Sequence, residues 1–293
     1  MAKPFLKWAG GKRQLINNIE KILPHDLISS KFTYVEPFVG SGAVLFWMLN
    51  NFPEIEKAVI NDINADLINV YQVIASKPQD LLSLLAILQT EFHHLESDPK
   101  KKKEYYYQKR EQYNNRRSDK TSQAALLIFL NRTCYNGLYR VNKKNQFNVP
   151  IGSYKRPAIY DTTNILAVSE ALQKVEIVIG DFEETLIHTN ENSFFYFDPP
   201  YKPLSDTSSF NSYAKAEFND TEQIRLRDFC MKLDDLGHRW MLSNSDVKGI
   251  DSEDDFFDSL YSDFQIERVK AKRMINSNSA KRGELNELLI RNY

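Results

Sequence analysis

The stretch from 194 to 201, Phe-Phe-Tyr-Phe-Asp-Pro-Pro-Tyr, constrains this chain more than any other. Four consecutive aromatic residues without a turn former predict a buried β-strand, and the prolines end it because proline cannot donate to a sheet ladder. Asp198 is thereby left at the carboxyl end of a strand, the edge where open α/β sheets bind ligands. Pro199 and Pro200 restrict the backbone there, and Tyr201 offers an aromatic ring beside the carboxylate. The alternative is a proline-rich turn that Asp198 merely caps.

Length and composition indicate an ordinary soluble protein. The chain has 293 residues, of which 42% are hydrophobic and 26% charged, enough for one large α/β domain or a domain with an insertion. No apolar run approaches the roughly 18 residues of a membrane span, and the N-terminus lacks the apolar core of a signal peptide. We therefore expect a cytoplasmic protein. Cys134 and Cys230 stand in unrelated contexts, which argues against a disulfide framework or a thiolate metal site.

The net charge of −1 conceals a strong asymmetry. Residues 100–156 carry 15 Lys and Arg against 3 Asp and Glu, a balance of +12, whereas the rest carries 23 against 36, a balance of −13. From Thr121 to Arg156 there is no acidic residue. Such a basic block predicts a phosphate-backbone partner. The alternative is a solvated helical face with scattered lysines.

Residues 34–42 predict a strand, a glycine-rich turn and then a helix over 43–49, which is the first unit of a Rossmann-like nucleotide site. The glycines permit a tight turn and close ligand approach, although two glycines do not match a dinucleotide fingerprint. Residues 58–62 read as a second strand that ends in Asp62, where an acid can accept ribose hydroxyls. The alternative is that Asp62 caps the helix expected over 64–74.

The N-terminal stretch 4–13 leads through Gly10-Gly11 into a helix with apolar residues at helical spacing. Backbone amides before a helix favour an anionic group, yet a Walker loop would need Gly at Leu6 and Ser or Thr at Arg13. The alternative is a simple Gly-Gly turn with Trp8 anchored in the core.

Residues 132–150 are rich in Asn, Arg, Lys and aromatics and read as a β-hairpin or loop. These side chains suit base reading and insertion into a base stack; a surface hairpin without a special role is the alternative.

Asp181 and Phe182 follow a strand over 175–179 and could hold an adenine, or Asp181 could cap the next helix. Further helices are expected over 78–117, 123–131, 221–236 and 251–261, strands over 239–242, 264–269 and 285–293, and a basic loop suited to phosphate contacts or a lid over 272–283.

Five motifs in this order resemble those of one enzyme family. They are Phe-Leu-Lys-Trp-Ala-Gly-Gly-Lys at 5–12, Glu-Pro-Phe-Val-Gly-Ser-Gly at 36–42, Tyr-Asn-Gly-Leu-Tyr-Arg at 135–140, Gln-Phe-Asn-Val-Pro at 146–150 and Asp-Pro-Pro-Tyr at 198–201. The chain resembles the Dam-type DNA adenine-N6 methyltransferases, the D12 class or alpha group that includes the DpnII-like enzymes, over nearly its full length.

The resemblance implies a Rossmann-like methyltransferase sheet in which one antiparallel strand joins the parallel ones. It implies S-adenosyl-L-methionine as donor, S-adenosylhomocysteine as product, and no metal ion. By motif position, Asp62 would bind the ribose, and Asp181 with Phe182 would surround the adenine of the donor. The full donor set is Trp8, Ala9, Gly10, Lys12, Glu36, Pro37, Phe38, Gly40, Ser41, Gly42, Asp62, Asp181, Phe182 and Asp198.

The resemblance also implies double-stranded DNA as partner, GATC as target, and no membrane or obligate protein partner, consistent with a monomer. Tyr135 matches the intercalating side chain, Asn136 the one beside the unpaired base, and Lys7 a contact at the first base pair. The base-reading positions match Leu138, Arg140 and Pro150. With the other polar residues of the loop, the expected DNA-binding set is Lys7, Arg132, Tyr135, Asn136, Leu138, Arg140, Asn142, Asn148 and Pro150.

The chemistry expected of Asp198, Pro199, Pro200 and Tyr201 follows from the substrate. An exocyclic amine on a purine is a poor nucleophile because its lone pair is drawn into the ring. If the Asp198 carboxylate and the Pro199 carbonyl accept its two hydrogens, the lone pair can attack a sulfonium methyl. The base must first leave the duplex, and stacking on Tyr201 offsets part of that cost.

The expected organisation is a catalytic domain of 1–77 and 158–293 with an inserted, mostly helical recognition domain of 78–157, whose hairpin covers about 134–150. A small-molecule or protein methyltransferase is disfavoured, because neither substrate explains the +12 balance of residues 100–156. Two other functions stay open from the sequence. One is an adenine methyltransferase of another DNA sequence or of RNA, and the other is a catalytically silent DNA-binding homologue. Whether the chain would act beside a restriction nuclease or in regulation is equally open.

Overall fold

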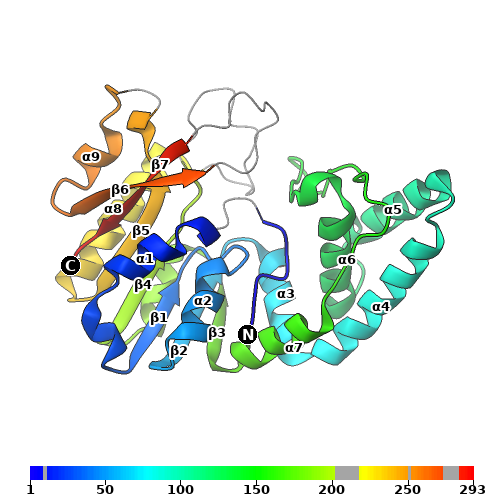
Figure 1. Cartoon of the computed structure of the whole chain (residues 1–293), viewed down its shortest axis with the longest axis horizontal. Coiled ribbons are helices and arrows are strands. Elements are labelled where there is room, and N and C mark those ends of the chain that lie inside the picture. The colour runs from blue at the N-terminus through cyan, green and yellow to red at the C-terminus, as the bar shows by residue number, and fades with distance from the viewer. Residues whose placement is uncertain (9–11, 202–217, 250–251, 273–283) are drawn as a thin grey trace.

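A mixed sheet forms the centre of the computed structural model, which describes residues 1–8, 12–201, 218–249, 252–272 and 284–293. The described residues contribute seven strands in the order β3-β2-β1-β4-β5-β7-β6 (Figure 1). Strands β1 to β5 pair in parallel, and β7 runs antiparallel to both β5 and β6. The predicted Rossmann-like fold class, including its one antiparallel strand, is confirmed. The strands are β1 (Phe32–Glu36), β2 (Ile55–Asp62), β3 (Val175–Ile179), β4 (Ser193–Phe197), β5 (Arg239–Ser245), β6 (Gln265–Lys272) and β7 (Glu284–Arg291).

Strand β4 is buried along its whole length, as its aromatic run predicts. Phe194 and Tyr196 join one buried hydrophobic cluster, whereas Phe195 and Phe197 join a second. Successive side chains of a strand point to opposite faces, so the alternation shows that both faces of β4 are covered. Asp198 therefore leaves a strand that is held from two sides.

Helices cover both faces of the sheet. Residues of α1, α2, α3 and α7 belong to the first cluster, and residues of α8 and α9 to the second. Within the described residues, no helix is long and apolar enough to span a membrane. The helices are α1 (Ile16–Ile22), α2 (Ala43–Asn51), α3 (Ala65–Ser76), α4 (Pro78–His94), α5 (Pro99–Asn114), α6 (Lys120–Thr133), α7 (Thr162–Ala171), α8 (Asp220–Asp235) and α9 (Phe256–Leu260).

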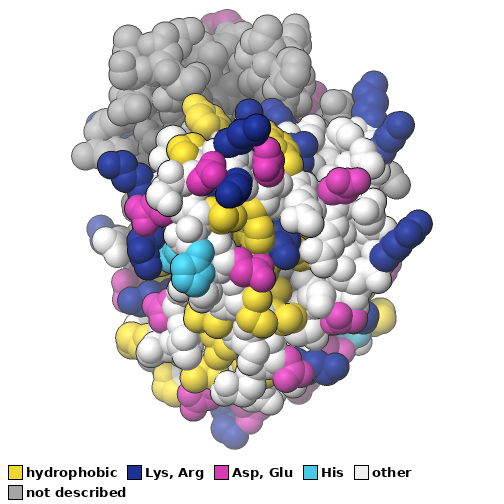
Figure 2. Space-filling model, turned by 90° about the vertical axis from the view of Figure 1, so that its right-hand side faces the viewer, with side chains coloured by type: hydrophobic (Ala, Val, Ile, Leu, Met, Phe, Trp, Pro, Cys, Tyr) yellow, Lys and Arg dark blue, Asp and Glu magenta, His cyan; other side chains and the backbone are white. Residues whose placement is uncertain are grey.

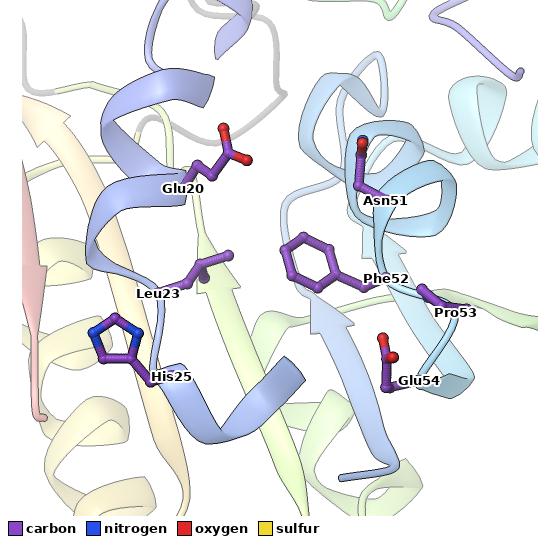
Figure 3. A pocket seen from close by; sticks show the side chains of 7 residues that line it. All are labelled: Glu20, Leu23, His25, Asn51, Phe52, Pro53 and Glu54. Carbon is purple, nitrogen blue, oxygen red and sulfur yellow. The ribbon is translucent and has the colours of Figure 1, made fainter. Parts of the chain in front are cut away.

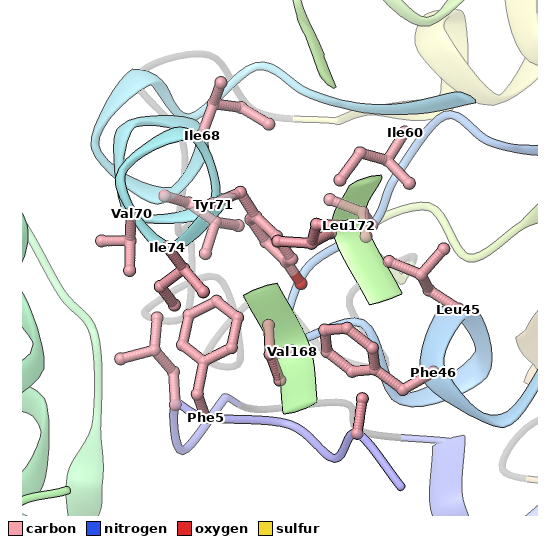
Figure 4. Packing of buried hydrophobic residues seen from close by; sticks show 14 of the residues in the cluster. Phe5, Leu45, Phe46, Ile60, Ile68, Val70, Tyr71, Ile74, Val168 and Leu172 are labelled. Atoms are coloured by element: carbon pink, nitrogen blue, oxygen red, sulfur yellow. The ribbon is translucent and has the colours of Figure 1, made fainter. Parts of the chain in front are cut away.

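The helices α4, α5 and α6 lie beyond α3, on the side of the molecule away from β5 and β7 (Figure 1). One buried cluster runs from the sheet into these helices without a break, from Ile60 through Tyr71 to Phe129. Figure 4 shows its central part, where Phe5 and Phe46 meet Tyr71. The expected division at 78 and 157 stays a prediction, because the helical part shares this core with the sheet.

Several predicted elements differ in extent. The stretch expected to be helical over 78–117 forms two helices, α4 and α5, with a break at residues 95–98. The acidic helix expected over 251–261 is wrong in length, since α9 covers only Phe256–Leu260. The Asp254 carboxylate accepts a hydrogen bond from the backbone N–H of Phe256 at 3.1 Å, a local bond that favours a helix start over a helix interior. The β-bridges of the expected hairpin are limited to two single ones: Cys134–Ile151, which encloses the short turn η3 (Tyr135–Gly137), and Val141–Phe147.

The cluster in Figure 4 generates a stability prediction. Phe46 is buried between Phe5 and Tyr71, so Phe46→Ala should lower the free energy of unfolding by about 3–5 kcal/mol. Urea denaturation measures the change. On the exposed face of α4, Ile87→Ala should stay within about 0.5 kcal/mol of the wild type. Equal effects of the two substitutions would contradict the assigned core.

Candidate active site

The carboxyl ends of the parallel strands bring the predicted acids to one edge of the sheet. Glu36 ends β1, Asp62 ends β2, and Asp198 follows β4. Strands β1 and β4 are neighbours although their chain connections run to opposite sides, so a crevice for ligands is expected between their ends. Residues that are up to 162 positions apart in sequence thus converge on one site.

A buried lysine connects the elements of this edge. The Nζ of Lys12, whose side chain is only 4% exposed, lies 3.2 Å from Oδ1 of Asp198 and 3.2 Å from Oε2 of Glu287 on β7. The Tyr201 hydroxyl donates to the same Glu287 oxygen at 2.6 Å. The Lys12 ammonium also lies 3.8 Å from the centre of the Tyr201 ring, within the range of a cation–π contact. Sequence reasoning missed Glu287, although an acid within the apolar run 285–290 was a signal.

Burial raises the pKa of Asp198 to about 6. The Lys12 ammonium acts against this shift, and the charge of Glu287 adds to it. The Ser243 hydroxyl, 3.4 Å from Oδ1 of Asp198, offers a further hydrogen bond and is itself 3.0 Å from the Tyr196 hydroxyl. Asp198 is therefore ionised at neutral pH and surrounded by donors.

The Asp-Pro-Pro-Tyr turn is fixed from outside itself. Pro199 and Pro200 have no backbone N–H, so only their carbonyls can be held by hydrogen bonds. The side-chain amide of Gln223, fully buried on α8, donates to the Pro200 carbonyl at 3.2 Å. Asn244 on β5 in turn donates to the Gln223 side-chain carbonyl at 3.1 Å. Neither Gln223 nor Asn244 was expected to contribute to the site.

The glycine-rich turn after β1 needs its glycines. Gly40 and Gly42 have φ of +48° and +72°, a region that L-residues rarely adopt. A Cβ at Gly42 would lie 2.6 Å from the Tyr71 hydroxyl, and one at Gly40 would lie 3.3 Å from the Trp8 ring. The Tyr71 hydroxyl donates to the Gly40 carbonyl at 3.0 Å. The turn is thus closely packed by its neighbours.

Asp62 connects this turn to the following helix. Its carboxylate accepts from the N–H of Gly40 at 3.2 Å and from the N–H of Asn64 at 2.9 Å. Burial raises the pKa of Asp62 to about 6, and these two hydrogen bonds oppose the shift. The N-cap of α3 is Asn64, so Asp62 is not the cap. Ile63 beside it is an exposed aliphatic residue that sequence reasoning did not single out.

Asp181 and Phe182 follow β3, and both are already engaged. Asp181 accepts from both terminal nitrogens of Arg225, at 2.9 and 2.7 Å, and from the N–H of Glu183 at 3.0 Å. Asp181 therefore caps the short helix that follows it, as the alternative interpretation predicted. The Phe182 ring is buried against Phe38, and the Arg225 guanidinium lies 4.3 Å from the ring centre. Arg225 was missed, and the adenine role of this pair stays a prediction.

The remaining residues of the expected donor set form the walls of the turn. Glu36 is buried and accepts a hydrogen bond from the Tyr34 hydroxyl at 2.7 Å, and burial raises its pKa. Ser41 is buried as well. The Asn61 amide donates to the carbonyls of Pro37 and Gly180, both at 3.1 Å, which joins the turns after β1 and β3. The predicted Ala9 and Gly10, and residues 273–283 of the predicted basic loop, lie outside the described residues.

The expected reading loop presents several of its residues to solvent. Tyr135 is 54% exposed, and Asn136 next to it has a φ of +55° and is also exposed. Arg140 is exposed and donates through Nε to Asn148 Oδ1 at 2.7 Å. Pro150 is exposed and accepts the N–H of Tyr135 at 2.8 Å, whereas Leu138 is half-buried.

Asn142 and Arg132 serve the loop internally. The Asn142 side chain accepts from the N–H groups of Lys144 and Gln146, at 2.9 and 3.0 Å, and so builds the turn at the tip. Arg132 turns inward and donates to the Phe5 carbonyl at 2.6 Å, and burial lowers its pKa. Asn142 and Arg132 therefore form hydrogen bonds within the protein, and their predicted contacts with DNA stay predictions.

The N-terminal segment is attached to the loop by one buried amide. Asn131 accepts the N–H of Lys7 at 2.8 Å and donates to the carbonyls of Lys7 and Gly137, at 2.8 and 3.0 Å. The Lys7 ammonium lies 3.3 Å from the Tyr154 hydroxyl. Lys7 is thereby placed next to Gly137, and its contact with the first base pair stays a prediction.

The basic block is less free than its count of charges suggests. Lys102 is buried and donates to the carbonyls of Tyr154 and Lys155, while Arg116 forms an ion pair with Asp66. Figure 2, which looks onto this end of the molecule, shows Lys and Arg side chains mainly along the upper and side edges, with Asp and Glu between them. Some of the basic side chains of residues 100–156 therefore form contacts within the protein.

A cavity of about 300 Å³ lies away from the carboxyl ends of the strands, where Asp62 and Asp198 are found. Figure 3 shows its lining side chains, which come from the segments before β1 and β2, at the amino ends of the strands. Its residues are Glu20, Leu23, His25, Asn51, Phe52, Pro53 and Glu54. Within the described part of the chain, no group of three or more His, Cys, Asp or Glu is arranged to hold a metal ion.

Comparison with known proteins identifies close relatives. Residues 8–275 match the family described as D12 class N6 adenine-specific DNA methyltransferase. The chain is 50% identical over 293 residues to the type II methyltransferase M.MjaIII of Methanocaldococcus jannaschii, with 99% of each chain covered. It is 35% identical over 290 residues to a DNA adenine methylase of Vibrio cholerae, with 98% of this chain and 95% of that protein covered. A solved rRNA methyltransferase, aviRa from Streptomyces viridochromogenes, aligns over 95% of this chain and 82% of its own with a TM-score of 0.37 and 11% identity, too distant to carry an argument.

The bond to Pro200 generates a second stability prediction. Gln223→Leu removes the donor to that carbonyl and the acceptor of Asn244, so it should lower the free energy of unfolding by about 1–3 kcal/mol. Gln108→Leu on the exposed side of α5 is the matched control. If the two variants unfolded at the same urea concentration, Gln223 would not hold the turn.

Proposed function

The chain belongs to the family of D12 class N6 adenine-specific DNA methyltransferases, and on this premise we propose how it acts. It transfers the methyl group of S-adenosyl-L-methionine to N6 of adenine in duplex DNA, within GATC, after the adenine has been flipped out of the helix. The observation that carries the proposal is the position of the Asp198 carboxylate: it follows β4 and lies 3.2 Å from the Lys12 ammonium and 3.4 Å from the Ser243 hydroxyl, and β4 is the strand next to β1, which leads into the Gly40–Gly42 turn.

The turn after β1 fits the donor in its shape. Gly40 and Gly42 hold the positive φ of a tight turn, and Tyr71 and Trp8 fill the places where a Cβ would stand, so the turn keeps a fixed shape after β1. Asp62 at the end of β2 supplies the carboxylate for the ribose hydroxyls, and Asp181 with Phe182 supplies an acid and a ring for the adenine. The bound donor contributes an electrophilic methyl group on a sulfonium.

Asp198 and the Pro199 carbonyl direct the amine. Each accepts one hydrogen of the adenine amino group, which returns lone-pair density to the nitrogen and stabilises the positive charge that develops on it. The carboxylate must be ionised to act as this acceptor, and the pKa of about 6 keeps it so at neutral pH. With the donor bound, this nitrogen would take its methyl group as the carbon–sulfur bond breaks, and the excess proton would leave to solvent.

Tyr201 provides the stacking surface for the flipped base. Unpairing a base costs a few kcal/mol, and stacking on a fixed aromatic ring recovers part of it. The hydrogen bond from the Tyr201 hydroxyl to Glu287 fixes one end of the ring before the base arrives. The Lys12 ammonium lies over one face of the ring, 3.8 Å from its centre.

Sequence reading belongs to the exposed loop. Arg140, Leu138 and Pro150 face the bases, Tyr135 inserts into the stack, and Asn136 attends the base that remains. A bidentate contact from arginine to guanine is the commonest specific contact in the major groove, and the Nε bond to Asn148 leaves the two terminal nitrogens of Arg140 for it. We place this activity in the cytoplasm of a prokaryotic or phage-infected cell, with the enzyme acting as a monomer.

The catalytic role of Asp198 is tested by substitution. Asp198→Ala should abolish methyl incorporation into unmethylated plasmid DNA, because the amine loses its charged acceptor, while DNA binding in a gel-shift assay is largely spared. Asp235→Ala, an exposed acid on α8, should retain wild-type transfer. Full residual activity of Asp198→Ala would overturn the proposal.

The reading role of Arg140 predicts a loss confined to one base pair. Arg140→Ala should cost about 1–3 kcal/mol of discrimination at that pair, measured on a panel of GATC duplexes and their single-base permutations. Lys143→Ala at the tip of the same loop serves as the control and should affect all duplexes alike. If Arg140→Ala also weakened every duplex equally, Arg140 would be a phosphate contact.

A further inference from the structure

Glu287 lies at the point where three elements of the site meet. It stands on β7, opposite Ser245 of β5 and Val269 of β6, on the antiparallel strand that none of the donor or base-reading motifs includes. One of its oxygens, Oε2, receives both the Lys12 ammonium at 3.2 Å and the Tyr201 hydroxyl at 2.6 Å. A single carboxylate oxygen therefore contacts the partner of Asp198 and the ring proposed to stack on the base.

The charges in this group are unequal. Lys12 carries one positive charge between the two carboxylates of Asp198 and Glu287, at equal distances of 3.2 Å. In the proposed reaction, an Asp198 oxygen must turn to the amine, and Lys12 competes for Asp198. A buried ammonium that loses its only carboxylate is costly because its desolvation is no longer compensated. A second carboxylate at the same distance removes that cost.

We propose that Glu287 is a positioning residue for methyl transfer: it keeps Lys12 paired while Asp198 exchanges Lys12 for the target amine, and it fixes the Tyr201 ring through the same oxygen. This role rests on the proposed function of Asp198. Glu287 does not touch the reacting atoms; it acts through Lys12 and Tyr201.

The charge of Glu287 affects the pKa of Asp198 in a defined direction. Asp198 is faced by Lys12 from the N-terminal segment, Glu287 from β7, Ser243 from β5, and Tyr196 from β4 itself, with Tyr34 and Glu36 nearby on β1. The ionised form of Asp198 is the active one, so the rate of the wild type falls as the pH drops through about 6. The negative charge of Glu287 raises the pKa of Asp198. Without that charge the pKa of Asp198 falls, and the acid limb of the pH–rate profile moves to lower pH.

The experiment measures methyl transfer from tritiated S-adenosylmethionine to unmethylated plasmid DNA, as kcat, KM for DNA and the pH profile. Glu287→Gln keeps the volume of the side chain and an acceptor for Tyr201 but removes the charge. It should lower kcat roughly 10- to 100-fold, because Lys12 stays on Asp198 and the amine is misplaced, while KM for DNA stays within about twofold. Its acid limb should lie at lower pH than that of the wild type.

Two further variants separate positioning from stability. Glu287→Asp restores the charge and should recover the wild-type acid limb together with part of kcat. Glu267→Gln makes the same substitution on the adjacent strand, at a partly exposed residue paired with Arg291, and should leave kcat and the pH profile unchanged. Thermal unfolding of each variant verifies that it is folded at the assay temperature.

The outcomes distinguish this role from the proposed function. If Glu287→Gln kept wild-type kcat and acid limb while Asp198→Ala was inactive, the role of Glu287 alone would be overturned. A loss of kcat without a shift of the acid limb, and without recovery in Glu287→Asp, would also overturn it, because such a loss is structural. Wild-type transfer by Asp198→Ala would instead overturn the proposed function.

Discussion

The burial of β4 on both faces is the constraint on which the rest of the site depends. Phe194 and Tyr196 pack into one hydrophobic cluster and Phe195 and Phe197 into the other, so the strand can neither tilt nor slide without exposing aromatic surface. Asp198 leaves this fixed strand directly, and the prolines after it have no N–H with which to form competing turns. The carboxylate position is therefore set by hydrophobic packing, and Gln223 adds a bond from outside.

Near this strand, the site contains buried carboxylates whose ionised forms are destabilised by the loss of water. Asp62 and Asp198 both have a pKa raised to about 6 by burial, yet each is surrounded by donors: backbone N–H groups at Asp62, and Lys12 and Ser243 at Asp198. An acid in this condition is ionised at neutral pH but only weakly stabilised. This suits the proposed role of Asp198, because its carboxylate can still accept hydrogen bonds from an incoming amine.

The N-terminal segment joins the donor side to the reading loop. The Trp8 ring, which packs against Gly40, stacks on Tyr139 of the loop at 5.1 Å. The Tyr139 hydroxyl donates to Asp66 at 3.2 Å, four residues after Asp62, and Asn131 attaches Lys7 to Gly137. The two halves of the proposed activity are thus connected by short, mostly buried contacts and by a common hydrophobic core.

Local sequence pattern was enough to predict the strands from their apolar runs, the turn from Gly40 and Gly42, the acid at the end of β4 and, through motif resemblance, the family. The predicted length of α9 was wrong, because the acids before Phe256 are as compatible with the residues that precede a helix as with its first turn. Tertiary structure alone decided that Glu287 meets Lys12, that Arg225 engages Asp181, that Arg132 turns inward and that Lys102 is buried. Each of these contacts joins residues dozens to hundreds of positions apart, so only the packing of distant segments against each other decides which partner a charged side chain meets.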